Sequence, residues 1–344
     1  LAANTTGYYN TAVGKDALAA NTTASSNTAV GRDVLTANTT GTGNTAAGKE
    51  ALATNTTASY NTAIGHEALK LNTTGTSNVA IGADALDANT TASNNTAIGT
   101  GSLGANTTGT RNSGVGASAM GLNTTGDYNT AMGYDALGAN TTADNNTAFG
   151  YTALAANTTG ARNNGFGSLS LNSTTTGNYN VGVGYGALYT ATTPNSNTAV
   201  GDTAMYATTT GAENTSVGSG SMRYNTTGAS NVAVGSGALN ANITGAGNVA
   251  IGALALDTST AISNTIAIGK GSLTANTTGV SNTAVGHEAL GANTSGGENV
   301  AMGYGALDAN TTASNNTGVG YLALSANTTG AGNTAVGTFT LDAN

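Results

Sequence analysis

The side chains that could carry chemistry in this sequence are few, and they are spread along the chain. Two histidines, His66 and His287, are each followed by a glutamate, Glu67 and Glu288, and this combination can bind a metal ion. The two histidines are too far apart in the sequence to share a site within one chain. Because the equivalent position elsewhere is occupied by unrelated residues, we interpret it as an exposed turn. The sequence therefore predicts no metal site, no cofactor and no catalytic residue.

Charged side chains gather near the start of the chain, in two adjacent columns. The acidic column contains Asp16, Asp33, Glu50, Glu67 and Asp84, and the basic column beside it contains Lys15, Arg32 and Lys49. The favoured interpretation is a solvated edge with weak ion pairs. A calcium site is the alternative, but the Asp and Gly spacing of calcium-binding nonapeptide repeats is missing.

Four tyrosines form two pairs with a constant separation, Tyr134 with Tyr151 and Tyr304 with Tyr321. Stacked aromatic pairs could contact the faces of sugar rings, which makes these four residues the candidates for surface contact. The favoured interpretation is that the rings cover a turn.

All of these residues occupy fixed places in a 17-residue repeat. The stretch Asn10-Thr11-Ala12-Val13-Gly14 returns throughout the chain, and its closing glycine is present at all 20 positions from Gly14 to Gly337. A second anchor is the Leu18 column, which holds Leu or Met in every copy. The residues expected to form the structural ladder are Asn10, Val13, Gly14, Leu18, Asn27, Gly31, Asn44 and Gly48.

This period predicts an all-β protein, a parallel β-solenoid (β-roll) of twenty 17-residue coils. We expect two short strands in each coil, 11–14 and 17–20, because the first is rich in β-branched residues and both are followed by turn formers. Coils about 4.8 Å apart would give a rod of roughly 90–100 Å. With no change in composition along it, 1–344 is expected to be one continuous array without caps, a segment of a longer protein.

The columns also predict how the coils pack. Asn10 begins a column that is Asn in nearly every copy, which favours an internal amide ladder over a row of ligand-binding side chains. The Ala12 column holds only small residues and the Val13 column only apolar ones. Both faces of this strand are therefore expected to be buried. Because one thin coil cannot bury both, we expect a homo-oligomer or lateral packing of rods.

Composition excludes some partners. The formal net charge is −8, with only 8 Lys and Arg residues, so a nucleic-acid partner is not expected. No apolar run reaches the roughly 20 residues that a membrane-spanning helix needs, so no membrane insertion is expected in this segment. The absence of cysteine excludes disulfides.

The repeats Asn10-Thr11-Ala12-Val13-Gly14, Asn78-Val79-Ala80-Ile81-Gly82 and Asn248-Val249-Ala250-Ile251-Gly252 resemble the head repeats of trimeric autotransporter adhesins. The fuller unit is also similar to repeats in phage tail-fibre and other surface-fibre proteins. The resemblance covers all twenty units. It implies a trimer of parallel β-rolls, left-handed in the adhesin family, that lies outside the cell and contacts a surface.

The sequence thus predicts a non-enzymatic extracellular fibre or adhesin shaft on a cell or virion surface. It would be a homotrimer, able to join end to end, that presents many copies of one surface to an unidentified surface or glycan ligand. The alternatives are a bacteriophage tail-fibre shaft and a solenoid that binds ice or polysaccharide. The ice-binding alternative is weakened because Thr22 and Thr23 are adjacent and would point in opposite directions on a strand.

Overall fold

The chain folds into stacked coils, each of which adds one strand to a parallel sheet. The computed structural model describes residues 1–342, so Asn344, the last residue of the predicted array, lies outside the described residues. The chain divides into two compact units, Leu1–Thr176 and Gly177–Asn344. In the sequence, the 17-residue spacing runs through this boundary without an insertion, from Asn163 to Asn180.

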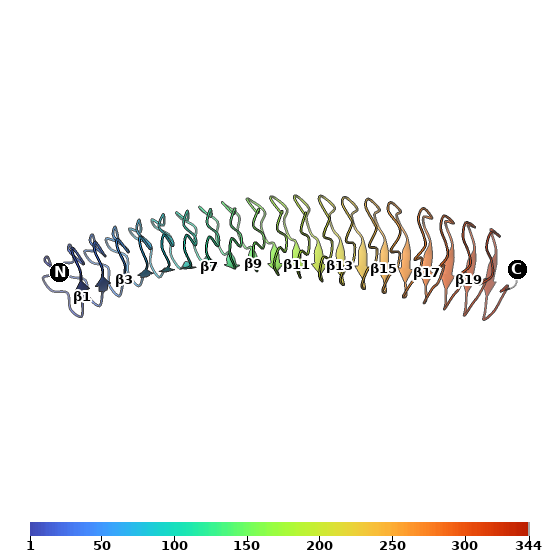
Figure 1. The fold of residues 1–344 in the computed structure, drawn as a ribbon, viewed down its shortest axis with the longest axis horizontal. Coiled ribbons are helices and arrows are strands. Elements are labelled where there is room, and N and C mark those ends of the chain that lie inside the picture. The colour runs from blue at the N-terminus through green and yellow to red at the C-terminus, as the bar shows by residue number, and fades with distance from the viewer. Residues whose placement is uncertain (343–344) are drawn as a thin grey trace. The chain divides into compact units, whose positions relative to one another are not determined.

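Every coil contributes a single strand of three residues, and the described residues contain no helix (Figure 1). The strands of the first unit are β1 (Thr11–Val13), β2 (Thr28–Val30), β3 (Thr45–Ala47), β4 (Thr62–Ile64), β5 (Val79–Ile81), β6 (Thr96–Ile98), β7 (Ser113–Val115), β8 (Thr130–Met132), β9 (Thr147–Phe149) and β10 (Asn164–Phe166). The strands of the second unit are β11 (Val181–Val183), β12 (Thr198–Val200), β13 (Thr215–Val217), β14 (Val232–Val234), β15 (Val249–Ile251), β16 (Ile266–Ile268), β17 (Thr283–Val285), β18 (Val300–Met302), β19 (Thr317–Val319) and β20 (Thr334–Val336).

Within each unit, successive strands pair in parallel and in register. In the first unit, for example, Thr130 of β8 lies opposite Thr147 of β9. In the second unit, Thr198 of β12 lies opposite Thr215 of β13. Partners in the ladder are therefore one repeat apart, and the prediction of an all-β parallel solenoid with a 17-residue coil is confirmed.

The prediction of a second strand in each coil is wrong. The stretch 136–139 forms turns, in which the amide of Asn140 donates to the carbonyl of Leu137 at 3.1 Å. Leu137 has a φ of 54°, and the equivalent Leu or Met is left-handed in every coil. The left-handed residue turns the chain, so that Ala136 and Leu137 are both buried although they are consecutive. A strand would have pointed one of them outward.

The strand face that looks into the coil carries the small residues. Ala148 of β9 is fully buried, whereas its neighbours Thr147 and Phe149 point outward and are partly exposed. The interior row must be small because the leucine column fills the coil. At Gly165, which replaces alanine in β10, an added Cβ would lie 3.5 Å from Cδ1 of Leu154. The large apolar row of each strand is consequently the one left facing outward in a single chain. Burial of both strand faces, which was expected to need a second chain, stays a prediction.

The glycine that ends each strand allows the coils to approach one another. Gly99 has a φ of 129°, a conformation that other residues rarely adopt. A Cβ on Gly99 would lie 2.5 Å from the carbonyl oxygen of Gly116 in the next coil. Two residues later, Gly101 has a φ of 63°, and an added Cβ would meet nothing within 4 Å. Asp84 and Ser118 hold the equivalent position of the neighbouring coils with the same left-handed φ.

These two glycines give a matched test of the stacking constraint. We expect Gly99→Ala to lower the free energy of unfolding by about 3 kcal/mol or more, because backbone strain and a clash with main chain combine. Gly101→Ala should cost only about 1 kcal/mol, the strain of a left-handed alanine. Urea unfolding followed by circular dichroism measures both, and equal losses would contradict the assigned role of Gly99.

Candidate functional surfaces

The Asn10 column forms an internal ladder at one end of the core. The side-chain oxygen of Asn27 accepts a hydrogen bond from the backbone amide of Asn44 at 2.9 Å. The side-chain nitrogen of Asn44 donates to the carbonyl of Ala58, also at 2.9 Å. Asn10 begins the series, accepting from the amide of Asn27 at 3.0 Å. Since Asn27 and Asn44 are fully buried, these side chains satisfy backbone groups and are not available to a ligand.

A second asparagine ladder, not predicted from the sequence, runs through the Asn21 column. The side-chain nitrogen of Asn38 donates to the side-chain oxygen of Asn21 at 3.1 Å and to the carbonyl of Gly41 at 3.0 Å. The same carbonyl accepts from Asn27 of the first ladder at 2.9 Å. The two columns therefore close one turn between them. The signal in the sequence was the recurrence of asparagine in a column that turn chemistry alone would also allow to be Asp, Ser or Gly.

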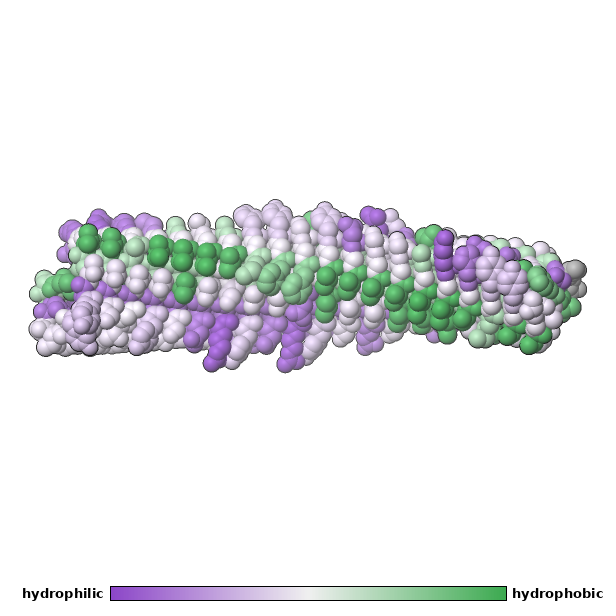
Figure 2. Space-filling model, turned by 90° about the horizontal axis from the view of Figure 1, so that it is seen from below, coloured by the Kyte–Doolittle hydropathy of each residue, from purple (hydrophilic) through white to green (hydrophobic). Residues whose placement is uncertain are grey.

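The outward row of the strands is an apolar stripe, which we define as the third residue of each strand. It contains Val13, Val30, Ala47, Ile64, Ile81, Ile98, Val115, Met132, Phe149 and Phe166 in the first unit. In the second it contains Val183, Val200, Val217, Val234, Ile251, Ile268, Val285, Met302, Val319 and Val336. Figure 2 shows hydrophobic residues gathered along one face of each unit. Ile98 is 37% exposed and Met132 is 41% exposed. A contiguous exposed apolar surface of this kind is typical of an interaction site.

The structure brings each of the two predicted tyrosine pairs together. The rings of Tyr134 and Tyr151 stack with their centroids 5.7 Å apart, and those of Tyr304 and Tyr321 with their centroids 5.3 Å apart. His287 extends the second pair, 5.3 Å from Tyr304. Because stacked rings cover each other's faces, they present edges and hydroxyl groups to solvent. A sugar could stack only on the face at the end of a row.

The charged edge is a connected network from the second coil to the fifth. Lys70 lies 2.7 Å from Glu50 and 3.1 Å from Glu67, and Lys49 lies 3.1 Å from Glu50. Arg32 of the preceding coil lies 3.6 Å from Glu50. Hydrogen bonds from Lys70 and then from Lys49 lower the pKa of Glu50 to about 2. The predicted solvated edge is therefore an edge with one well-paired carboxylate at its centre.

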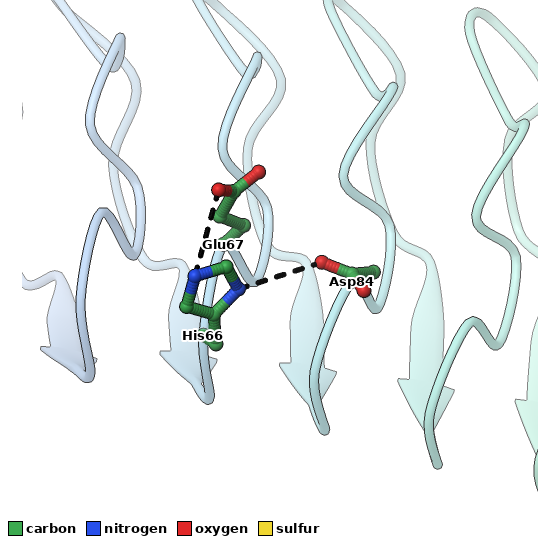
Figure 3. Close-up of side chains that lie close together, drawn as sticks. All are labelled: His66, Glu67 and Asp84. Atoms are coloured by element: carbon green, nitrogen blue, oxygen red, sulfur yellow. Dashed lines mark ion pairs between the residues drawn. The ribbon is translucent and has the colours of Figure 1, made fainter.

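At the end of this network, His66 lies between two carboxylates from adjacent coils (Figure 3). Its Nε2 is 3.6 Å from Glu67, and its Nδ1 is 3.7 Å from Asp84 of the next coil. The side chains of His66 and Asp84 are about half exposed, and that of Glu67 is a quarter exposed. His287 has the same neighbour in its own coil, Glu288 at 3.6 Å.

A shallow groove of about 470 Å³ lies over the turns of the first unit, lined by Gly101, Gly121, Leu122, Asp135 and Gly138 among others. Partial burial raises the pKa of the Asp135 carboxyl. A smaller groove, of about 280 Å³, lies in the second unit and is lined by Glu288 and Asp308 among others. The pKa of the Asp308 carboxyl is raised by burial and then by the charge of Glu288.

No protein-family model matches this chain, and no curated protein is similar to it at a significant level. Within residues 1–342, no helix is long and apolar enough to cross a membrane.

The first asparagine ladder supplies acceptors for buried backbone amides, whereas the second mainly links side chains to one another. Substitutions in the two ladders should therefore lower the free energy of unfolding by different amounts. Asn112→Ala removes the side-chain oxygen that accepts a hydrogen bond from the buried backbone amide of Asn129 at 2.9 Å. We expect the free energy of unfolding to fall by about 1–3 kcal/mol. Asn106→Ala, in the second ladder, should cost less, because Asn123 still donates to Gly126 at 3.1 Å. Denaturant unfolding of both variants measures the difference, and a larger loss for Asn106→Ala would contradict it.

The charged edge predicts a pH dependence of stability. Because the pKa of Glu50 is lowered in the folded state from 4.5 to about 2, its ionised form stabilises the fold above pH 4.5. That contribution is lost as the pH falls through about 2. We expect Glu50→Gln to unfold at lower urea concentration than the wild type at pH 7, and the two midpoints to converge near pH 2.

Glu288→Gln is the matched control, since Glu288 holds the same left-handed position but lies 3.6 Å from His287 instead of beside two lysines. Its urea midpoint should differ less from the wild type at pH 7. A Glu50→Gln difference that stays constant from pH 7 to pH 2 would show that the ion pairs do not stabilise the fold.

Proposed function

We propose that this protein is a non-enzymatic structural fibre, the shaft of an extracellular attachment device, assembled from several copies of the chain. The observation that supports this proposal best is the apolar stripe. It places a partly exposed Val, Ile, Met or Phe on the outer face of nearly every strand in both units. Burial of such a surface is the main favourable contribution to the association of proteins.

The partner that fits the stripe is a second copy of the same chain. Successive side chains of the stripe are separated by the spacing between paired strands, about 4.8 Å. Another copy carries the same side chains at the same spacing, so two stripes can pack coil against coil along each unit. A stable interface needs about 800 Å² from each partner, which a single coil cannot provide and a row of ten coils can.

A trimer about a common axis is the assembly that we favour. Cyclic symmetry gives a closed assembly in which every stripe is covered. The similarity of the repeat to the head repeats of trimeric autotransporter adhesins and to phage tail-fibre repeats supports three chains. It also supports a place on a cell or virion surface.

Attachment would be multivalent. A turn position returns at every coil, so where one residue type recurs in successive coils a weak contact with a surface or glycan is repeated along the fibre. The tyrosine rows offer such contacts, since Tyr134 and Tyr151 are each 56% exposed and Tyr304 and Tyr321 are nearly as exposed. Their ring edges and hydroxyls, rather than their faces, would contact the ligand.

A scaffold role is favoured over the alternatives by how the polar groups are used. The buried asparagines bond to the backbone, and the charged edge pairs its members with one another. The ice-binding alternative relied on threonine hydroxyls. In the Thr22 column these donate to the next coil, as Thr107 does to the carbonyl of Thr124 at 3.1 Å.

A double substitution in the stripe tests the assembly. We expect the wild-type chain to sediment as a trimer. Ile98→Lys combined with Met132→Lys should shift it towards a monomer, because two charges would have to be buried without partners. Analytical ultracentrifugation measures the mass, and circular dichroism checks that the β structure is kept.

The control is Thr108→Lys combined with Thr125→Lys, at exposed turn positions of neighbouring coils, and it should sediment as the wild type does. A monomeric wild-type chain, or a stripe variant that still forms a trimer, would contradict assembly through the stripe.

A further inference from the structure

We propose that His66, Glu67 and Asp84 bind one Zn²⁺ ion and that the ion joins two adjacent coils. His66 and Glu67 follow β4, and Asp84 follows β5 in the next coil. The site is independent of the proposed function, since it lies on the turns and not on the apolar stripe.

The geometry brings one ligand atom from each side chain within reach of a single ion. A ring nitrogen of His66 and carboxylate oxygens of Glu67 and Asp84 all lie within 4.8 Å of one another. Figure 3 shows the imidazole between the two carboxylates, one near each ring nitrogen. A metal ion takes one of these nitrogens. Both carboxylates can turn to it, because the side chains are at least partly exposed.

The local charge favours a cation. Asp87 lies one turn after Asp84, and its pKa is raised by burial, then by the charge of Asp84 and more weakly by that of Glu67. The carboxylate of Asp87 is therefore repelled by those of Asp84 and Glu67. The nearby lysines are already paired, since Lys70 is shared between Glu67 at 3.1 Å and Glu50 at 2.7 Å, and Lys49 lies 3.1 Å from Glu50. A divalent ion would relieve this repulsion.

One imidazole nitrogen and two carboxylate oxygens suit Zn²⁺, which binds such ligands at 2.0–2.2 Å with tetrahedral geometry. A water molecule would complete the fourth position. Because Asp84 comes from the next coil, the bound ion would add to the hydrogen bonds that hold β4 and β5 together. Binding to the folded chain alone would raise its stability.

The second histidine provides a natural comparison within the chain. His287 and Glu288 repeat the pair His66 and Glu67, but the next coil has Gly305 where the first site has Asp84. It also has Tyr304 stacked on His287 at 5.3 Å, where the first site has the small Ala83. Only the first histidine therefore has a carboxylate from the next coil, and only it should bind the ion.

The test is isothermal titration of ZnCl₂ into the full chain at pH 7.5, where histidine is mostly neutral. We expect one Zn²⁺ per chain. His66→Asn should abolish binding, and Glu67→Gln and Asp84→Asn should each weaken it by at least about 10-fold. His287→Asn should leave it unchanged. The thermal midpoint should rise with Zn²⁺ in the wild type and not in His66→Asn.

A gain of binding gives a second, independent readout. The double variant Tyr304→Ala with Gly305→Asp gives residues 304–308 the same sequence as 83–87, and it should bind a second Zn²⁺ at His287. The proposal is overturned if the wild type binds no Zn²⁺ at about 100 µM, a concentration that fills any site with a Kd well below it, or if binding survives His66→Asn. If the wild type binds no Zn²⁺, the imidazole of His66 merely bridges two carboxylates.

Discussion

Stacking of one coil on the next, through main-chain hydrogen bonds between neighbouring coils, is the constraint on which the structure depends. The amide of Thr130 donates to the carbonyl of Asn146, and the amide of Leu137 donates to that of Ala153, both at 2.9 Å. Such bonds form only if every coil follows the same path. The columns with a special backbone conformation must therefore hold residues that can adopt it, and Gly133, with its φ of 139°, shows the strictest of these positions.

The same constraint explains how much of the fold could be predicted from the sequence. Parallel pairing in register follows from a period without insertions, and the buried ladder of the Asn10 column follows from its near-constant asparagine. The prediction of a second strand in each coil was wrong because it was based on adjacent apolar residues such as Ala136 and Leu137. Apolar composition indicates burial, but it does not distinguish a strand from a turn in which a left-handed leucine points two successive side chains inward.

For the candidate surfaces, the sequence predicted which residues become neighbours but not the direction in which they point. A separation of one repeat was enough to place Tyr134 beside Tyr151. It could not show that the rings would cover each other's faces, which changes what they offer to a ligand. In the strands, alternation separated Ala148 from Phe149, but only the complete burial of Ala148 in the structure shows that the larger side chain faces outward.

A solenoid makes sites in a way that a search for motifs along the chain does not detect. Side chains that are 17 residues apart lie side by side, so a site is assembled from one column or from two adjacent columns. Asp84 reaches His66 in this way, and Lys70 reaches Glu50. Columns that support the backbone admit little change, whereas turn columns accept any residue with the required φ. Chemical differences along the chain therefore concentrate in the turns, while the strand face keeps one apolar character suited to assembly.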